Sequence, residues 1–497
     1  MKKIIIIGSG SSGLMAAAMF KRFYAGRIKV EVYYDSKKKN IGVGESTTPA
    51  FVDFLKRFLK VEIGDFIKDT GSTVKLGINF KNWTGSKEYF HGFNACNIEG
   101  TGVDYPESLY SIPNGTYNGG TLHHKPTTTV PSHDFYYDHA FHIDTQIVTQ
   151  YILDDIEDEI DRIDDVVEKV NSDGKSIQSI IFKNSGEVTA DFYVDASGFN
   201  SILFKHLNPD WVDITGDLPL DRAIPQQIPH KLVDIPSYTQ AEATKDGWTW
   251  QIPLKKRYGT GYVYSSKFTT DEEAKKNYNE WLKKNHGVEL NEDPRIIHYK
   301  PGYYKKNWIG NCLSVGLASG FIEPLESTGL QILYNQIQFF VKNNTTLKFL
   351  EFDRINYNNF NEESYVDVFN FICLHYNTNR TDSPFWQYMT DNKTDWMKAY
   401  EEKCSLEFIP CGITDEDSQF HIDSFIQVSN GLEMINVDSV NKFLKDLPKA
   451  KKILEDSKSL HEVLQSIKKK KNYVPHRSVL NGSVTVSYTH LRAHETN

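Results

Sequence analysis

The chain has 497 residues, of which 39% are hydrophobic and 13% aromatic, and its formal net charge is −9. This length supports a large core and more than one structural unit, and the acidic balance disfavours nucleic-acid binding. No uninterrupted apolar run of about 18 residues is present, so a membrane span is not expected. Five scattered cysteines without CxxC pairs argue against disulfide and metal sites and suit a reducing cytoplasm.

The N-terminus predicts the opening of a doubly wound α/β sheet. Residues 2–7, KKIIII, favour a buried parallel strand, which a glycine-rich turn, the apolar helix GLMAAAMFKRF and a second strand, KVEVYYD, follow. Gly8, Gly10 and Gly13 form GxGxxG at the mouth of this helix, where backbone N–H groups can contact a pyrophosphate. Asp35 ends the second strand, where it can accept a hydrogen bond from a ribose hydroxyl. The segment therefore predicts a dinucleotide site, the alternative being a fortuitous glycine turn.

Two further loops extend this prediction. GVGEST at residues 42–47 lies shortly after the second strand, and DASGFNS at 195–201 ends a later one. Several such loops could contact a flavin dinucleotide along its whole length. They therefore favour FAD over a nicotinamide cofactor bound in a single mononucleotide fold.

The remaining elements are read from periodicity in chain order. Residues 95–140 predict long ordered loops, 144–165 a helix, and 176–182 and 189–198 strands. Residues 254–268 favour a hairpin in a separate sheet. Beyond about residue 330 the pattern is mostly helical, beginning with GLQILYNQIQFFVKN.

These patterns suggest a division of the chain. An FAD-binding body covers residues 1–340 with substrate-side insertions at about 75–130 and 205–300, and a mostly helical substrate region covers 341–480. Residues 483–497 do not continue the helical pattern and are interpreted as a non-native tail.

One motif connects these features to a known family. The segment WTWQIP contains Trp248, Trp250, Ile252 and Pro253 and matches the pattern WxWxIP. By this motif the chain resembles the flavin-dependent halogenases of the tryptophan halogenase type. The segments IGVGESTTP, VKLGINFKNW, AFHIDT, NCLSVGLASGFIEPLESTG and FICLHYNTNRTDSPFW resemble the family in the same order. The resemblance implies that the two tryptophans line the flavin pocket. The structural alternative is a strand whose tryptophan rings pack against the core.

The resemblance implies two catalytic residues. The family lysine maps to Lys75, in a strand-like apolar context, and the family glutamate maps to Glu326. Thr328 and Gly329 are implied to bind halide through backbone N–H groups, with Ser327 coupling the flavin and substrate compartments. A capping box at the start of the next helix is the structural alternative for Ser327 and Thr328.

The resemblance also implies cofactors and partners. Reduced FAD and oxygen would convert chloride, bromide or iodide into hypohalous acid, and a separate NAD(P)H-dependent reductase would supply the flavin. His91 and Phe93 are the implied contacts of the aromatic substrate, a surface loop being the alternative, and a homodimer is compatible with the sequence. The residues implied to contact FAD are Gly8, Gly10, Gly13, Asp35, Gly42, Gly44, Glu45, Ser46, Thr47, Trp248, Trp250, Gly316 and Leu317.

The substrate stays open between an indole, a tryptophan-like compound and a phenol. Tyr400, Glu401 and Glu402 do not reproduce the late tyrosine pair and glutamate of family members that act on free tryptophan. Rival functions are a flavin-dependent aromatic hydroxylase and a catalytically inactive FAD-binding redox protein.

Overall fold

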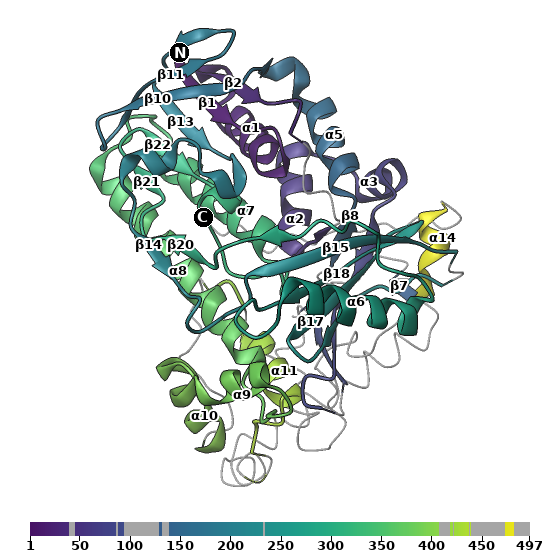
Figure 1. The fold of residues 1–497 in the computed structure, drawn as a ribbon. Coiled ribbons are helices and arrows are strands. Elements are labelled where there is room, and N and C mark those ends of the chain that lie inside the picture. Colours follow the sequence, from purple (N-terminus) through teal and green to yellow (C-terminus); the bar gives the residue numbers. More distant parts are fainter. Residues whose placement is uncertain are drawn as a thin grey trace, which may run out of the picture. The chain divides into compact units, whose positions relative to one another are not determined.

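The computed structural model describes residues 1–38, 45–85, 88–93, 129–131, 139–231, 234–406, 418–420, 422–436, 438 and 473–481 (Figure 1). The chain divides into two compact units. The first unit comprises Met1–Val61, Ile143–Asp221 and His298–Val366, and the second comprises Glu62–His142, Arg222–Ile297 and Asp367–Asn497. Both units are assembled from three separate stretches of sequence.

A mainly parallel sheet forms the centre of the first unit. Its strands are β1 (Lys2–Ile7), β2 (Ile28–Tyr34), β9 (Asp161–Asp164), β13 (Phe192–Asp195), β22 (Cys312–Ser314) and an antiparallel edge strand, β21 (Trp308–Ile309). The order β9-β2-β1-β13-β22 is that of a dinucleotide-binding fold, with the reversal of strand order beside β1. This fold places a nucleotide at the carboxyl ends of the strands, where β1 and β13 end together as Ile7 pairs with Asp195.

Helices cover this sheet because their apolar residues face it. The helices are α1 (Ser11–Tyr24), α2 (Pro49–Phe54), α5 (Thr145–Ile156) and α7 (Gly329–Asn343). Phe340 of α7 packs 5.2 Å from the Phe192 ring and 4.8 Å from the Trp308 ring, measured between centroids. Smaller sheets of β10 (Val167–Ser172), β11 (Ile177–Phe182) and β12 (Gly186–Val188), and of β14 (Trp211–Asp213), β20 (Gly302–Tyr304) and β23 (Gly320–Phe321), complete the unit.

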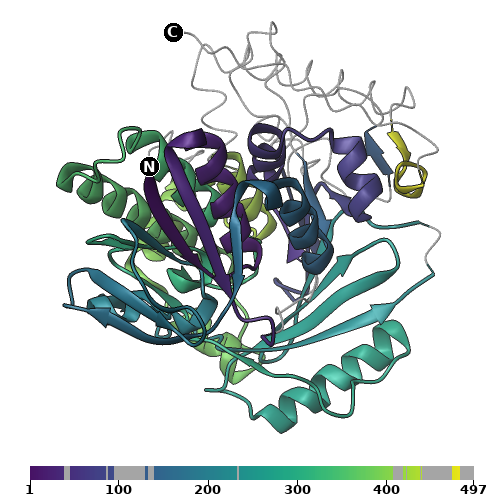
Figure 2. The same cartoon turned by 90° about the horizontal axis from the view of Figure 1, so that it is seen from above.

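A largely antiparallel sheet forms the centre of the second unit. Its order is β19 (Ile297–His298), β15 (Arg222–Pro229), β18 (Arg257–Tyr264), β17 (Gly247–Pro253), β16 (Thr239–Ala243), β5 (Gly77–Lys81) and β6 (Glu88–Gly92). Helix α6 (Asp271–His286) lies along the strands (Figure 2) and buries Tyr278 and Leu282 against Tyr262 and Tyr264. The N-cap Thr270 of α6 accepts a hydrogen bond from the Glu273 amide, which satisfies an amide that the helix leaves unpaired.

Short strands and helices complete the second unit. β4 (Thr73–Lys75) pairs antiparallel with β8 (Ala140–Ile143), and β7 (Thr129–Pro131) pairs with β24 (Tyr473–Pro475). The helices are α3 (Ile63–Thr70), the C-terminal part of α8 (Glu351–His375), α9 (Pro384–Asp391), α10 (Asp395–Leu406), α11 (Ile422–Gly431) and α14 (His476–Leu480). None of the helices in the described ranges is long and apolar enough to cross a membrane.

The structure confirms the doubly wound fold and most predicted elements, and it corrects two. The helix predicted over residues 144–165 ends at Ile156, and Asp161–Asp164 form β9, because pairing with β2 outweighs their low intrinsic strand preference. The predicted hairpin has its turn at Leu254–Lys256, so its first strand is the WTWQIP segment itself.

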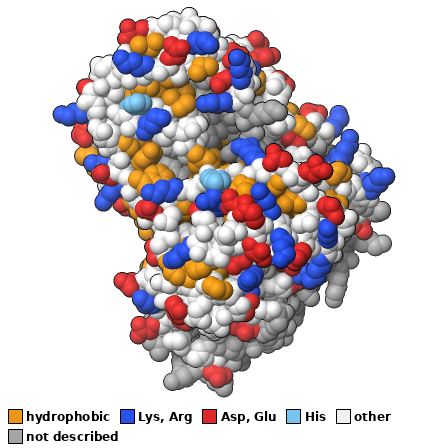
Figure 3. Space-filling view, in the orientation of Figure 1, with side chains coloured by type: hydrophobic (Ala, Val, Ile, Leu, Met, Phe, Trp, Pro, Cys, Tyr) orange, Lys and Arg blue, Asp and Glu red, His pale blue; other side chains and the backbone are white. Residues whose placement is uncertain are grey.

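Several predictions fall outside the described residues. The loops predicted over 95–140 lie mostly there, as do Gly42, Gly44 and the tail at 483–497. The division at residue 340 stays a prediction. On the face drawn in Figure 3, acidic and basic side chains alternate, and no patch of one sign dominates it.

Candidate active site

The GxGxxG turn of the first unit is shaped by contacts that exclude side chains. Gly8 has a φ of +117°, and a Cβ on it would lie 2.4 Å from the Ala196 carbonyl oxygen. A Cβ on Gly13 would lie 1.8 Å from the Gly8 carbonyl oxygen. Gly10 is the N-cap of α1 and therefore supplies no side chain to the amides of the first helical turn, which also contains no acidic residue. These amides and the positive end of the helix fit the pyrophosphate of FAD.

The other residues predicted to contact FAD in this unit lie at the strand ends or the loops behind them. Asp35 follows β2 directly, and its Oδ1 accepts a hydrogen bond from the Lys37 amide. Glu45 and Ser46 form β3 (Glu45–Ser46), Thr47 is fully buried, and burial raises the pKa of the Glu45 carboxyl. The contact of these residues with the cofactor stays a prediction.

Gly316 and Leu317 form a short turn packed against the start of α1. Gly316 has a φ of +59°, and a Cβ there would lie 2.4 Å from Ser12 Oγ. Gln336 Oε1 accepts a hydrogen bond from the Gly316 amide at 3.2 Å, and Gln336 Nε2 donates to Ser319 Oγ at 3.0 Å. Gln336, which motif analysis missed, therefore fixes this turn to α7.

Gly13→Ala should weaken FAD binding by about tenfold or more, equivalent to ~1.4 kcal/mol, because the new methyl group displaces the turn that contacts the pyrophosphate. Fluorescence titration of the purified protein with FAD measures the change. Gly26→Ala is the matched control, since a Cβ there meets no described heavy atom within 4 Å. Equal affinity of the Gly13 variant and the wild type would remove this turn from the cofactor site.

The segment GFIEPLESTG joins β23 to α7. Glu323 and Glu326 are 2% and 3% exposed, and Ser327 has a left-handed φ of +61°, which is uncommon for a residue with a side chain. Thr328 occupies the N-cap position of α7, but its side chain forms no capping hydrogen bond within the described part of the chain. Thr328 therefore does not supply the side-chain cap of this helix, and the backbone N–H groups at a helix start suit an anion such as a halide.

The two glutamates have different surroundings. Tyr299 is 9% exposed, and burial, followed by the nearby charges of Glu323 and Asp221, raises the pKa of its hydroxyl well above the usual value. Glu323 therefore borders a packed tyrosine of the first unit. Glu326 immediately precedes the left-handed Ser327, so the strained turn sets the direction of its backbone.

In the second unit, Lys75 is the last residue of β4 and is fully buried. Its Nζ lies 5.1 Å from the centroid of the Phe93 ring, and the Phe93 amide donates to the Leu76 carbonyl at 3.1 Å. His91, two residues before Phe93, lies on β6 opposite Ile78 of β5 and is 6% exposed. The structure therefore brings the predicted catalytic lysine into contact with a predicted substrate residue, whereas Lys75 and Glu326 belong to different units.

A buried chain of hydrogen bonds connects the strand of Lys75 to the WTWQIP motif. Thr73 Oγ1 donates to the Pro253 carbonyl at 2.5 Å and therefore accepts from His142 Nδ1 at 3.0 Å. His142 Nε2 then accepts from Thr239 Oγ1 at 3.0 Å. This pattern requires a neutral imidazole, and burial, followed by the nearby charge of Lys75, holds the pKa of His142 well below its usual value.

The WTWQIP strand is buried on both faces. Trp248 and Trp250 are 2% and 8% exposed, and Trp250 pairs with Gly261, where a Cβ would lie 2.1 Å from the Trp250 ring. Gly261 thus provides the space that the second indole occupies. The Trp248 Nε1 has no hydrogen-bond acceptor among the described residues.

Two further contacts hold the predicted substrate segment. Gln427 of α11 is fully buried, and its Oε1 accepts from the Gly92 amide, between His91 and Phe93, at 2.9 Å. His375 Nδ1 hydrogen-bonds the Tyr89 hydroxyl at 2.9 Å. Neither Gln427 nor His375 was predicted, since each acts through a contact distant in sequence.

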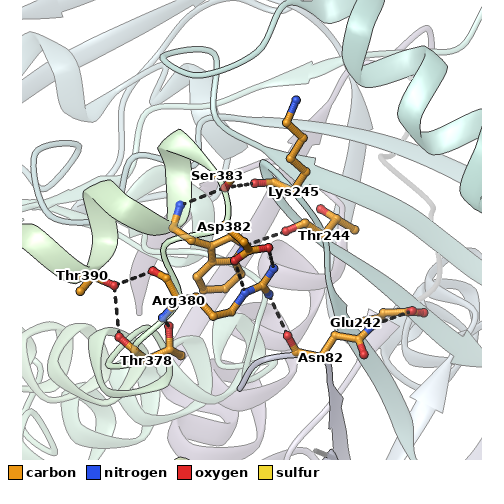
Figure 4. A network of polar contacts seen from close by, with 10 residues as sticks. Asn82, Glu242, Thr244, Lys245, Thr378, Arg380, Asp382, Ser383 and Thr390 are labelled. Atoms are coloured by element: carbon orange, nitrogen blue, oxygen red, sulfur yellow. Dashed lines mark hydrogen bonds and ion pairs between the residues drawn. The ribbon is translucent and has the colours of Figure 1, made fainter. Parts of the chain in front are cut away.

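The FICLHYNTNRTDSPFW segment ties two loops of the second unit together (Figure 4). The Arg380 guanidinium donates to both carboxylate oxygens of Asp382 and to the Asn82 carbonyl, and it lies 4.2 Å from the Trp386 ring centroid. Trp386 Nε1 donates to the Thr244 carbonyl at 2.7 Å. The ends of β5 and β16 are therefore fixed by one arginine and one tryptophan.

The late acidic and aromatic residues have structural partners. Tyr400 is 2% exposed and its hydroxyl lies 2.8 Å from Ser429 Oγ, while Glu401 pairs with Lys393 at 2.8 Å. That Tyr400, Glu401 and Glu402 do not reproduce the pattern of family members that act on free tryptophan stays a prediction. No group of three His, Cys, Asp or Glu side chains in the described ranges could hold a metal ion.

The buried histidines His142 and His476 should make the second unit less stable at acidic pH, because burial lowers the pKa of both. Burial lowers the pKa of His476 from 6.5 to about 4. Below pH 6.5 the unfolded chain takes up a proton that the folded chain excludes, so stability falls as the pH falls. We expect the free energy of unfolding to drop by about 2 kcal/mol more between pH 7 and pH 5 in the wild type than in His476→Gln. Equal pH dependence of urea unfolding in both proteins would contradict this.

The fold and the glycine turn define a dinucleotide-binding protein of the FAD type with a second, sheet-based unit. Comparison with known proteins narrows this class. The family model described as tryptophan halogenase matches residues 3–448, and the chain belongs to this family of flavin-dependent halogenases. Tryptophan 7-halogenase RebH of Lentzea aerocolonigenes is 28% identical over 421 residues, which cover 78% of each chain. Tryptophan 6-halogenase SttH of Streptomyces toxytricini is 27% identical, over 79% of this chain and 81% of the relative.

Solved structures support the fold. The crystal structure of a tryptophan halogenase from Shewanella frigidimarina NCIMB 400 matches with a TM-score of 0.86 and 22% identity over 99% of each chain. Tar14, a tryptophan C-6 flavin-dependent halogenase (chlorinase) from taromycin biosynthesis, matches with a TM-score of 0.85 and 24% identity, covering 97% of this chain and 99% of that chain. The family resemblance inferred from the sequence is confirmed.

Proposed function

We propose that this enzyme halogenates the ring of an indole substrate of the tryptophan type, using hypohalous acid that Lys75 directs. The observation that carries the proposal is the fully buried Lys75, whose Nζ lies 5.1 Å from the Phe93 ring centroid. Removing an ammonium group from water is costly, so a fully buried lysine beside an aromatic ring is a candidate functional residue. The names of the two relatives, a tryptophan 7-halogenase and a tryptophan 6-halogenase, support an indole ring.

The cofactor and halide would be held by groups of the first unit. The amides at the start of α1 and the glycines around them suit the FAD pyrophosphate, and the amides of Thr328 and Gly329 suit a halide. A Cβ on Gly329 would meet no described heavy atom within 4 Å, so this end of α7 has room for an anion. When bound, reduced FAD would activate oxygen, and the oxygen would supply the oxidising equivalents that convert halide into hypohalous acid.

Lys75 and Glu326 have distinct proposed roles in the substitution. The Lys75 ammonium donates a hydrogen bond to the oxygen of hypohalous acid, which orients the halogen toward the ring. The oxygen–halogen bond breaks as the ring carbon bonds to halogen, and the oxygen leaves as water with a proton from Lys75. The ring proton passes to the Glu326 carboxylate, and both side chains then exchange protons with solvent.

Binding of the ring is proposed for His91 and Phe93. Gln427 contacts Gly92, the last residue of β6, and would thereby hold His91 and Phe93 on either side of it in place. A separate NAD(P)H-dependent reductase would supply the reduced flavin.

Product analysis tests the proposal. The enzyme is supplied with FAD, a flavin reductase and chloride, bromide or iodide, together with tryptophan, a tryptophan-containing peptide, simple indoles and phenols. We expect a halogen mass shift on an indole that requires halide, oxygen and the reductase. Oxygenated products that form without halide would instead indicate the aromatic hydroxylase. FAD binding without any turnover would indicate an inactive redox protein.

A further inference from the structure

The described C-terminal segment places a histidine side chain against the strand of Lys75. His476 is fully buried at the start of α14, and its Nε2 accepts a hydrogen bond from the Val74 amide at 2.8 Å. Its Nδ1 lies 3.2 Å from the Ile235 carbonyl oxygen and donates to it. One neutral imidazole therefore bridges β4 and the segment that precedes β16. Burial favours this form, since it lowers the pKa of His476 to about 4.

The bridge completes the backbone hydrogen bonding around Lys75. One edge of β4 pairs with β8, where Lys75 is opposite Ala140. N–H groups two residues apart point to the same edge of a strand, so the amides of Val74 and Leu76 share the other edge. The Leu76 amide donates to the Ser237 carbonyl at 2.7 Å, and the Val74 amide donates to His476. The amides of the residues before and after Lys75 are therefore both held, that of Val74 by His476 and that of Leu76 by Ser237.

The segment that carries His476 is anchored independently of this hydrogen bond. β24, which leads into the helix α14 labelled in Figure 1, pairs with β7 through three residue pairs. Lys255 Nζ donates to the Leu480 carbonyl at 2.7 Å. Val479 and Leu480 are also buried. A change of the imidazole alone can therefore remove the contact to Val74 while the segment keeps its other contacts.

We propose that His476 is a positioning residue, which holds the backbone of β4 so that the Lys75 side chain points in one direction. His476 lies beyond residues 3–448, the part of the chain that the family model matches. The inference rests on the proposed role of Lys75. Without the imidazole, the Val74 amide loses its acceptor in a fully buried position, and β4 must shift or admit water to satisfy it.

Two substitutions separate the two hydrogen bonds of His476. The Oε1 of His476→Gln can replace the Nε2 acceptor toward Val74, whereas the shorter His476→Asn places its amide near Nδ1 and leaves Val74 without an acceptor. Val479→Ala is the matched control, because it removes buried apolar atoms from the same helix and leaves the imidazole in place.

The first measurement is the fraction of consumed reduced flavin that ends as halogenated indole, with a β-diketone trapping any hypohalous acid released. We expect His476→Asn to lower this fraction by about tenfold to a hundredfold, with hypohalous acid still released. We expect His476→Gln to restore most of the fraction, and Val479→Ala to stay within twofold of the wild type. An equal loss in His476→Asn and Val479→Ala would overturn the proposal, because it would indicate a general loss of packing.

The second measurement does not depend on halogenation. Hydrogen–deuterium exchange of the peptide that contains residues 73–77 should be faster in His476→Asn than in His476→Gln. Unchanged exchange in His476→Asn would overturn the positioning role. If the wild type halogenates no arene while the exchange difference is present, the proposed function fails but the contact between His476 and β4 stands.

Discussion

Lys75→Met should lose about a thousandfold in the yield of halogenated arene, while reduced flavin and oxygen are still consumed. Lys75 is fully buried beside Phe93, and methionine keeps a side chain of similar length but cannot donate a hydrogen bond to hypohalous acid. The released oxidant should instead appear on a β-diketone trap. Product mass spectrometry and trap absorbance, measured in the same reaction, separate formation of the oxidant from its use.

Lys68→Met is the matched control for this experiment. Lys68 lies on α3 of the same unit and is exposed, so its substitution should leave yield and trapping unchanged. If Lys75→Met still halogenates one ring position at the wild-type rate, Lys75 has no role in the reaction. A variant that no longer consumes reduced flavin would also contradict the proposed role, which concerns only the substitution step.

Glu326→Gln should slow halogenation by about a hundredfold to ten-thousandfold, the usual range for loss of a general base. The amide keeps the shape of the 3% exposed carboxylate but cannot accept the ring proton. Loss of this proton should then limit the rate, so a substrate deuterated at the reacting carbon should react more slowly than its protium form in the variant. Competition between the two forms, followed by mass spectrometry, measures this isotope effect.

Glu323→Gln provides a comparison three residues away. Glu323 is equally buried at 2% exposure, but it borders the packed Tyr299 and has no proposed step in the chemistry. We expect this variant to keep the halogenation rate per folded molecule, with any loss confined to thermal stability. Similar rate losses in both variants would mean that the turn as a whole, and not the carboxylate of Glu326, determines the rate.

Local sequence was sufficient to predict the nucleotide half of the protein. The strand KKIIII, the three glycines and the helix after them form one continuous stretch, so their periodicity and backbone requirements are visible without any tertiary contact. The same holds for α7, whose apolar stripe and start at Gly329 agree with the prediction. The prediction was wrong at Asp161–Asp164, since only pairing with β2 makes that acidic stretch a strand.

Recognisable sequence motifs contain the residues proposed to act on substrate but not the residues that hold them. Lys75, Glu326, His91 and Phe93 belong to recognisable segments, and the family relation that they indicate is confirmed. Gln336, Gln427 and His375 carry no local signal, because a buried glutamine or histidine resembles any other until its partner is known.

The surroundings of Lys75 show most clearly what local sequence cannot specify. Thr73 contacts His142 across 69 residues and Pro253 across 180, and the Val74 amide contacts His476 across 402. Sequence patterns determined that a lysine would lie on a short apolar strand. Only the folded chain decided which donors and acceptors hold that strand, because hydrogen bonds of buried groups are satisfied by whichever side chains the fold brings within about 3 Å.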